Sequence, residues 1–322
     1  LKDNGIDLPI EEGYYWLDRQ IIKAYDTQGN LHKLYRIKID DDLNITYTKY
    51  KYKIIELENW QDTIKRKIDG IIHREKESIK IVQDKLNQYN DYQPIVLTST
   101  GKDSEVVRHL VSQLIDNLQI VFNNTSLDCA DTYKMAKNIP NCKIINPNLG
   151  FYQWIKDNII PTRFSRACCT YFKEGAMTHK LDKNKKYLFF IGMRNEESIN
   201  RSKYETEWKN EKWGNRDWIG ILPIRKWTEE DIWLYILWKG INFNPKYRKG
   251  YSRVGCAIAC PFYSKSTWIL DKYWYPTMYA RWHNILEEDF KNNYKWTRLN
   301  CTLEEYHTCW NGGLLRKEPT EE

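Results

Sequence analysis

A short polar segment that follows an apolar run is the first feature with recognisable chemistry. The run Pro94-Ile95-Val96-Leu97 has the composition of a buried strand. The residues after it are small or charged: Ser99, Thr100, Gly101, Lys102, Asp103 and Ser104. Such residues allow a tight turn with exposed N–H groups, and a helix starting near Asp103 would direct its positive end there. Lys102 and Ser104 could contact phosphate and Asp103 could hold Mg²⁺, so the segment indicates a phosphate loop, with an ordinary strand-to-helix turn as the alternative.

Eight cysteines are the second chemical feature, and four of them occur in pairs. Cys168 is adjacent to Cys169, and Cys260 follows Cys256 after three intervening residues. In a chain without a secretory signal, such pairs favour thiolate ligands over disulfides. Four thiolates suit a [4Fe-4S] cluster or tetrahedral Zn²⁺, and buried cysteines without any ligand are the remaining alternative.

The other four cysteines are more scattered. Cys129 and Cys142 fall in or beside predicted core elements, and we expect them to be packed. Cys301 and Cys309 fall in a C-terminal segment, 300–313, that is rich in Tyr, Trp and His. We take Cys309 as the candidate catalytic thiol that carries sulfur, and a cap packed around Trp310 is the alternative.

Net charge and hydropathy limit the classes of protein. The 322-residue chain has 41% hydrophobic residues and a net charge of +7, and residues 1–60 are slightly acidic, so the basic excess lies in the remainder. A basic surface fits nucleic acid or a phosphate-rich ligand, and a solvated lysine-rich surface is the alternative. Because no apolar run approaches 18 residues and no secretory signal is visible at the start, we expect no membrane contact and a cytoplasmic location.

Hydrophobic periodicity divides the chain into regions. Residues 13–60 alternate in short aromatic strands around a turn at 26–30, which predicts a small antiparallel sheet within an accessory region, 1–60. Residues 61–92 form a helical linker with one or two amphipathic helices. Apolar strands then alternate with helical patterns, which predicts an α/β fold: a doubly wound parallel sheet with helices on both faces over 93–262. A helical and aromatic, cysteine-bearing segment, 263–322, completes the chain.

Two later motifs have local interpretations. Arg194 and Arg201 flank a loop with Glu196, Glu197 and Ser198, and their planar side chains could grip phosphate or sulfate while the carboxylates orient them. Surface ion pairing is the alternative. Residues 228–233 are interpreted as structural, because a threonine cap is followed by an acidic first helical turn and a buried face.

Taken in order, these segments resemble a known family. Residues 99–104 resemble the S-G-G-K-D-S loop of the N-type ATP pyrophosphatases, in the branch similar to phosphoadenosine phosphosulfate (PAPS) reductase. The further matching motifs are Val121–Leu127, Arg166-Ala167-Cys168-Cys169 with Lys173, Gly192–Ser198 with Arg201, Leu222-Pro223-Ile224 before Trp227–Trp233, and Tyr247–Cys256. This resemblance adds Thr125 and Lys173 to the expected nucleotide contacts. Six ordered motifs argue against a chance match.

The resemblance implies an activity as well as a fold. Reductases of this family bind a nucleotide that is already sulfated and typically have an altered loop, so the intact Gly-Lys-Asp-Ser sequence implies that ATP is the substrate. The implied reaction is attack of an acceptor oxygen on the α-phosphate, loss of pyrophosphate assisted by Mg²⁺, and displacement of AMP by sulfur. DNA phosphorothioation sulfurtransferases and tRNA thiolases share this loop and cysteine set, and we rank DNA phosphorothioation-like transfer first.

The same resemblance favours an iron–sulfur cluster, because C-C with C-x-x-C resembles the ligand set of adenylylsulfate (APS) reductases. The three residues between Cys256 and Cys260 depart from that spacing and leave the choice of ligands open. A sulfonucleotide reductase is the main alternative function, although its C-terminal E-C-G-L-H segment is replaced by His307-Thr308-Cys309-Trp310. An ATP-binding subunit of a larger complex is a third hypothesis.

Expected partners follow from the same hypothesis. They are a nucleic acid acceptor, either DNA or tRNA, and a cysteine desulfurase or other sulfur donor. Assembly as a homo-oligomer is also open.

Overall fold

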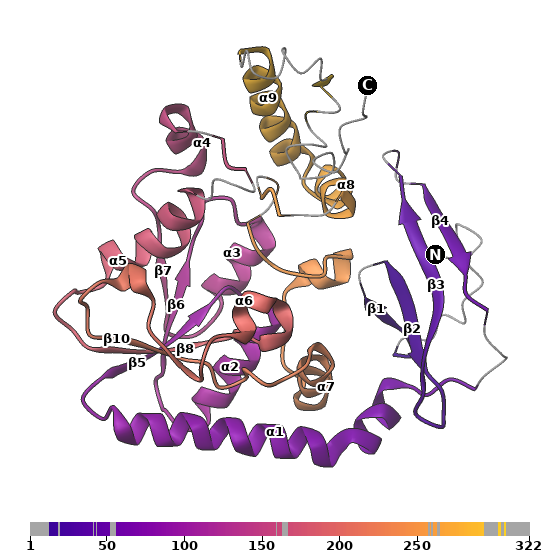
Figure 1. The fold of residues 1–322 in the computed structure, drawn as a ribbon, viewed down its shortest axis with the longest axis horizontal. Coiled ribbons are helices and arrows are strands. Elements are labelled where there is room, and N and C mark those ends of the chain that lie inside the picture. The colour runs from indigo at the N-terminus through magenta and orange to yellow at the C-terminus, as the bar shows by residue number, and fades with distance from the viewer. Residues whose placement is uncertain are drawn as a thin grey trace, which may run out of the picture.

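Two separate β-sheets are joined by one long helix. The computed structural model describes residues 13–18, 20–40, 42, 44–51, 56–158, 160–162, 167–256, 258, 260–262, 265–292, 302, 303 and 306. Figure 1 shows a small sheet on one side of the molecule and a larger sheet flanked by helices on the other. This is the expected α/β fold with an accessory antiparallel sheet.

The N-terminal sheet has four antiparallel strands in the order β1-β2-β3-β4. Their bounds are Trp16–Asp18 (β1), Ile21–Tyr25 (β2), Leu31–Ile39 (β3) and Ile45–Lys49 (β4). Ile22, Ala24 and Leu34 are among the buried residues of its core. At the predicted turn, the Asp26 carboxylate accepts hydrogen bonds from the N–H groups of Gln28 (3.0 Å) and Asn30 (2.8 Å), which fixes the reversal between β2 and β3.

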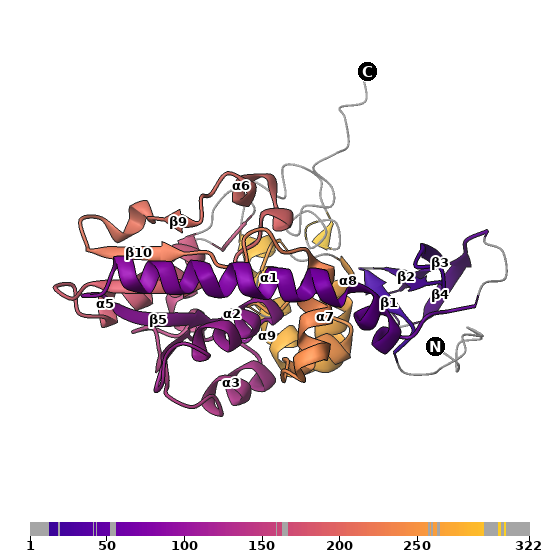
Figure 2. The ribbon, with the colours of Figure 1, turned by 90° about the horizontal axis from the view of Figure 1, so that it is seen from below.

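Helix α1, Trp60–Gln88, runs from the small sheet along the central sheet (Figure 2). It is a single helix of 29 residues, where the sequence allowed one or two, and Asn59 caps it by accepting from the N–H of Asp62. Its buried Ser78 accepts from the Trp227 indole N–H and donates to the Pro223 carbonyl, both at 2.9 Å. No helix in the described part of the chain has the length and apolarity that a bilayer-spanning segment requires.

The central sheet has six strands in the order β7-β6-β5-β8-β10-β9. The strands are Gln93–Thr98 (β5), Gln119–Asn123 (β6), Cys142–Ile145 (β7), Tyr187–Ile191 (β8), Glu207–Trp208 (β9) and Trp218–Ile221 (β10). All neighbours are parallel except β9, which pairs antiparallel with β10. The chain builds outward from β5 to β7 and then returns to the other side of β5 with β8. This reversal creates a switch point at the carboxyl ends of β5 and β8, where ligands of such sheets bind.

Helices cover both faces of this sheet (Figure 1). Alternate strand residues point to opposite faces, so Val96 and Phe190 pack with α1, α2 and α7, whereas Ile95 and Phe189 pack with α5 and Trp213. The helices are Lys102–Ser112 (α2), Ala130–Lys137 (α3), Phe151–Trp154 (α4), Ala176–Lys180 (α5), Ile199–Ser202 (α6), Glu229–Lys239 (α7), Lys265–Trp274 (α8) and Pro276–Asn292 (α9), with short turns at Ile155–Asp157 (η2), Cys169–Gly175 (η3, a π-helix), Asn195–Glu197 (η4), Glu211–Trp213 (η5) and Pro245–Lys249 (η6). The apolar strands predicted over 93–262 include β5, β6, β7 and β8.

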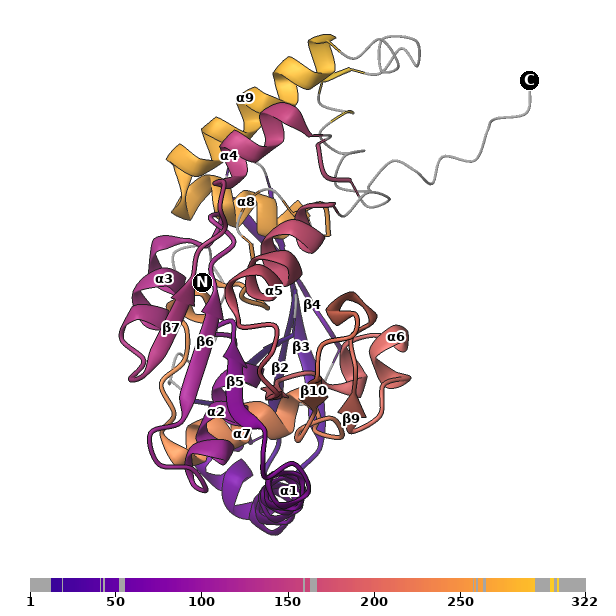
Figure 3. The ribbon, with the colours of Figure 1, turned by 90° about the vertical axis from the view of Figure 1, so that its left-hand side faces the viewer.

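A third hydrophobic cluster lies beyond one end of the central sheet. Figures 1 and 3 both show α4, α8 and α9 gathered there. Phe151, Trp282 and Leu286 are buried in this cluster, together with Leu127 and Cys129 from the connection after β6. Because β6 ends at Asn123, the cluster adjoins the carboxyl ends of the strands, beside the switch point.

Gly192 lets the end of β8 approach the start of α2. A Cβ atom at this position would lie 2.7 Å from the carbonyl carbon of Asp103 and 2.8 Å from the nitrogen of Ser104. Both contacts are with backbone atoms, which cannot move aside as the end of a flexible side chain could. Only glycine therefore allows the two connections at the switch point to touch.

We expect Gly192→Ala to lower the free energy of unfolding by about 1–3 kcal/mol, the usual range for overpacking. Urea denaturation followed by circular dichroism measures this change. Gly70→Ala is the matched control, because a Cβ at exposed Gly70 of α1 meets nothing within 4 Å. Alanine at this position should leave the free energy of unfolding unchanged or raise it by about 0.5–1 kcal/mol. Equal stability of the two variants would contradict the close approach.

Candidate functional site

The loop between β5 and α2 turns at Thr100. Its φ of 57° places a β-branched residue in the left-handed region, whereas Gly101 has an ordinary extended conformation. The Thr100 N–H donates to Thr98 Oγ1 (2.9 Å), and Thr100 Oγ1 accepts from the Asn244 amide (2.7 Å). The strained position expected of a glycine is thus occupied by a buried threonine that two hydrogen bonds hold in place.

Two hydroxyl groups of the loop maintain its shape. Ser104 Oγ donates to the Gly101 carbonyl (2.8 Å) and accepts from the Ser99 N–H (3.3 Å), and Ser99 Oγ accepts from the Gly101 N–H (3.4 Å). The Ser104 hydroxyl thus closes the loop on itself, and its predicted contact with phosphate stays a prediction. The loop is held in shape by its own side chains.

Lys102 and Asp103 lie in a buried network of ion pairs at the switch point. Asp103 Oδ1 accepts from Arg194 Nε (2.5 Å), and Asp103 Oδ2 lies 3.3 Å from Lys102 Nζ. Lys102 Nζ is also 3.3 Å from Glu229 Oε1, and Arg194 Nη1 donates to Glu196 (2.7 Å). The side chain of Lys102 is 6% exposed and that of Arg194 is 3% exposed. Three carboxylates thus hold two cations at the end of the loop.

Both cations remain charged in this network. Burial acts to lower the pKa of Lys102, but the negative charges of Asp103 and Glu229 outweigh it and raise that pKa. Arg194 follows the same pattern, since Asp103 more than offsets its burial and raises the pKa. Arg201 is less enclosed, with 39% of its side chain exposed and an ion pair to Glu197, whose other oxygen accepts from the Arg194 N–H. Arg201 is thus connected to the network through one carboxylate.

The segment 244–256 joins the loop to the second part of the site. The Lys102 N–H donates to the Tyr247 hydroxyl (3.0 Å), and Asn244 bonds Thr100 and Thr132 (2.7 and 3.1 Å). A Cβ at Gly101 would lie 3.9 Å from the side chain of Val254. Val254 precedes Cys256 by two residues, so this thiol lies within about two residue lengths of the loop.

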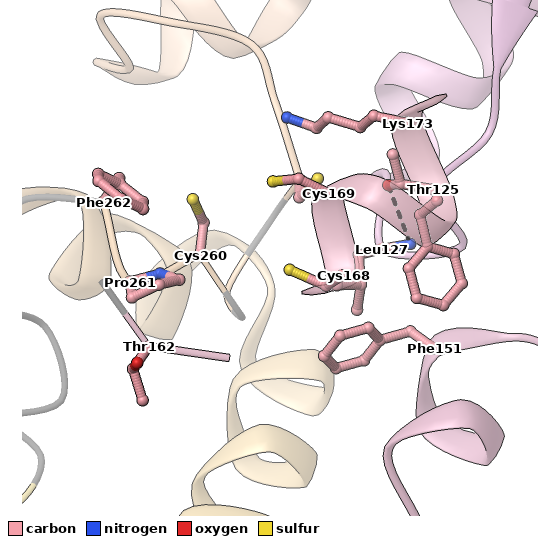
Figure 4. A pocket seen from close by; sticks show the side chains of 12 residues that line it. Thr125, Leu127, Phe151, Thr162, Cys168, Cys169, Lys173, Cys260, Pro261 and Phe262 are labelled. Atoms are coloured by element: carbon pink, nitrogen blue, oxygen red, sulfur yellow. Dashed lines mark hydrogen bonds between the residues drawn. The ribbon is translucent and has the colours of Figure 1, made fainter. Parts of the chain in front are cut away.

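Four cysteines line one pocket beside the loop (Figure 4). Cys168 and Cys169 come from the start of η3, and Cys256 and Cys260 come from the connection before α8. The empty space within the pocket is about 440 Å³, open solvent included. Folding thus brings together the four thiols that the sequence singled out.

Lys173 and Thr125 lie in this pocket. The negative charges of Cys256, Cys169 and Cys260 raise the pKa of Lys173, and burial opposes this only in part. A contact with Cys169 and burial raise the pKa of the Cys168 thiol, and burial raises that of Cys256. Lys173 therefore provides the cation that a group of thiolates needs in a buried site.

Thr125 belongs to a tight turn after β6. Its N–H and hydroxyl both donate to Asp128 Oδ2, at 2.7 and 2.9 Å, and it also bonds Cys256. Both Thr125 and Lys173 lie against the thiols, and their predicted contact with nucleotide stays a prediction.

A cluster of iron and sulfide would meet a suitable set of donors in this pocket. Four thiolates are the ligands that a [4Fe-4S] cluster takes. Across the described residues, however, no three His, Cys, Asp or Glu side chains are gathered as the ligands of one metal ion. The thiols share a pocket but would have to converge to ligate a cluster.

The extra residue between Cys256 and Cys260 has a defined place. Ile258 has a φ of 67° and is fully buried against α8 and α9, and its N–H donates to Asp271 Oδ2 (3.1 Å). Asp271 Oδ1 accepts from the Tyr251 hydroxyl (2.7 Å). A β-branched residue in this conformation is strained, and Asp271 of α8 holds the strained segment in place.

Several residues of the site were not predicted from the sequence. Glu229 was interpreted as part of a structural helix start, and the capping box of Thr228 and Asp231 is confirmed, but Glu229 also reaches Lys102. Asn244 and Asp128 carried no signal beyond local turn chemistry. Cys129 is buried and Cys142 half-buried, as expected. Arg166, Cys301 and Cys309 lie outside the described residues.

Comparison with known proteins places this site in a family. Residues 93–261 match the model of the phosphoadenosine phosphosulfate reductase domain. An uncharacterized protein of Methanocaldococcus jannaschii is 27% identical over 282 residues, which cover 84% of this chain and 68% of that protein. The chain spans about half, 49%, of a second uncharacterized protein from that organism.

An adenosine 5'-phosphosulfate reductase of Anoxybacillus flavithermus is 26% identical over 222 residues, which cover 66% of this chain and 91% of that enzyme. The crystal structure of phosphoadenylyl-sulfate reductase from Candida auris aligns with a TM-score of 0.44 and 14% identity, over 58% of this chain and 94% of that one. Since the family match extends over more than half of its residues, the chain belongs to the phosphoadenosine phosphosulfate reductase domain family.

Proposed function

We propose that this protein is an ATP-dependent sulfurtransferase, which adenylates an acceptor and then replaces AMP with sulfur. One observation carries the proposal: a loop with Lys102 and Asp103 in a buried ion network lies next to a pocket lined by four cysteines. Adenylation needs a site for the phosphates of ATP, and sulfur transfer needs a thiol or cluster within reach of the activated atom. The segment from Asn244 to Cys256 joins the phosphate loop to the cysteine pocket.

Lys102 is suited to hold the pyrophosphate of ATP. Its two ion-pair contacts, both 3.3 Å, are longer than the 2.7–2.9 Å of good charge-assisted hydrogen bonds. A phosphate oxygen can therefore draw the ammonium away from Glu229 at little loss, and the buried position strengthens the new contact. Arg194 keeps Asp103 oriented during this exchange.

Asp103 would be the Mg²⁺ ligand, and the metal would stabilise the charge on the leaving pyrophosphate. Both of its carboxylate oxygens face cations in the structure, so it becomes available when Lys102 turns to the phosphates. A [4Fe-4S] cluster in the cysteine pocket would supply or bind the sulfur that is transferred. Lys173 would neutralise part of the thiolate charge there, and Thr125 and Asp128 would fix the position of Cys256.

The acceptor is proposed to be nucleic acid, as in DNA phosphorothioation, and a cysteine desulfurase is the proposed source of sulfur. The basic charge of residues 61–322 supports a polyanionic acceptor. Sulfonucleotide reduction is the second candidate function. The similarity to the reductase of Anoxybacillus flavithermus supports it, because the match covers 91% of that enzyme. Sulfite release from a sulfated nucleotide, with a dithiol and no cleavage of ATP, would favour this second function.

We expect Lys102→Ala to reduce pyrophosphate release from Mg-ATP by at least tenfold, because it removes a charged contact worth about 1.5–3 kcal/mol. The measurement uses anaerobically purified protein with DNA or tRNA present. Lys65→Ala is the control, since Lys65 is 77% exposed and pairs only with nearby Asp62 among the contacts described. Unchanged release in Lys102→Ala would remove the loop from the mechanism.

We expect anaerobically reconstituted protein to bind iron and sulfide and to absorb broadly in the visible range. Cys168→Ser or Cys256→Ser should remove most of the bound iron and the absorbance, because each withdraws one thiolate ligand. Cys142→Ser is the matched control, because Cys142 belongs to β7 and lies outside the pocket. Stoichiometric zinc in a colourless protein would show that the pocket holds a different metal.

A further inference from the structure

A basic and aromatic surface lies directly outside the site. It is formed by the end of η6 with the residues that follow it and by the last turn of α8. Its members are Arg248, Lys249, Arg253, Lys272, Tyr273 and Trp274, and we name it the η6–α8 surface. The two parts are joined because the Trp274 indole N–H donates to the Lys249 carbonyl (3.1 Å) and Gly250 packs near Leu270.

Two large aromatic side chains on this surface face solvent. Tyr273 is 56% exposed and Trp274 is 40% exposed, and their rings meet edge to face with centroids 4.8 Å apart. Buried Ile269 and Asp271 provide the packing face of helix α8, whereas Tyr273 and Trp274 are exposed. Neighbouring exposed aromatic residues beside a site are a common mark of a binding surface.

Cationic side chains lie on the same two segments as these rings. The Lys249 ammonium lies 5.1 Å from the Trp274 ring centroid and pairs with Asp131 (2.5 Å), and the Arg248 guanidinium lies 5.1 Å from the ring of Phe243. Arg248, Arg253 and Lys272 are exposed. One cation against the Trp274 ring and three exposed cations on the same two segments suit a ligand that has both negative charge and flat apolar groups.

The surface borders both halves of the site. Arg248 follows Tyr247, whose hydroxyl accepts from the Lys102 N–H, and Arg253 precedes Val254, which lies near Gly101. Arg253 is also close enough to Lys173 for the two positive charges to interact. A chain of phosphates on this surface would therefore be led to the point where the loop and the cysteine pocket meet.

We propose that the η6–α8 surface binds a single-stranded segment of the nucleic acid acceptor, with bases stacked on Tyr273 and Trp274 and phosphates held by the neighbouring cations. Stacking on aromatic rings combined with a basic track is how single strands are bound without sequence preference. The indole hydrogen bond to Lys249 fixes one ring before binding, which reduces the entropy lost on binding. This inference rests on the proposed function, because it identifies where its acceptor lies.

Fluorescence anisotropy with labelled oligonucleotides of about ten nucleotides tests the inference. Single-stranded DNA and RNA of one sequence, the matching duplex and poly-glutamate are compared in the absence of ATP. We expect a single strand to bind more tightly than the duplex, and Tyr273→Ala to weaken its binding by about 5- to 150-fold, the loss of one stacked base. Arg248→Gln should weaken binding and reduce the salt dependence of log K by about 0.7, the value of one phosphate contact.

Tyr47→Ala and Lys65→Gln are matched controls, since Tyr47 is 40% exposed on β4 of the N-terminal sheet and Lys65 is exposed on α1, both outside the η6–α8 surface. Thermal unfolding of each variant confirms that it is folded. The inference would be wrong if neither Tyr273→Ala nor Arg248→Gln changed the binding of the oligonucleotide. It would also be wrong if poly-glutamate competed as well as the oligonucleotide, because an acidic protein would then be the better partner.

The two proposals can fail separately. Because binding is measured without ATP, a protein that binds single strands through this surface but releases no pyrophosphate would contradict the proposed function alone. Nucleic-acid-stimulated pyrophosphate release with strand binding that is insensitive to Tyr273→Ala would contradict this inference alone.

Discussion

Two hydrogen bonds from the turn at 244–247 hold the site together. Asn244 bonds the side chain of Thr100 at the strained point of the loop, and Tyr247 accepts from the N–H that begins α2. Both residues belong to the same connection that ends in Cys256, one of the pocket thiols. Movement of this connection would therefore disturb the phosphate loop and the cysteine pocket at once, so the geometry of each depends on the other.

The strands and the order of elements could be predicted from the sequence because they depend on local signals. Apolar runs bounded by turn residues marked β6 and β8, and Thr228 with Asp231 marked the start of α7. The four pocket cysteines were also identified, since closely spaced pairs of cysteines in a chain without a visible secretory signal indicate thiolate ligands. The resemblance supplied the family, which the match over residues 93–261 bears out.

Side-chain partners that depend on tertiary contacts could not be predicted in this way. Glu229 has a complete local explanation as a residue of an acidic first turn, so nothing in the sequence indicates its second contact with Lys102. The contacts of Thr125 and Lys173 with the pocket thiols join segments far apart in the sequence, so no local pattern indicates them, and their contact with nucleotide stays a prediction. The placement of Cys309 stays a prediction, because it lies outside the described residues.

Asp271 lies beyond the residues that match the family and yet supports the cysteine pocket. The family match stops at residue 261, yet this carboxylate of α8 holds both Tyr251 and the strained Ile258 within the cysteine-bearing connection. Ile258 itself is buried against Trp282 and Leu286 of α9. A chain shortened at the family boundary would keep all four pocket cysteines but lose the support that sets the spacing of two of them. The part of the chain that fixes the cysteine pocket is therefore larger than the family domain and includes both C-terminal helices.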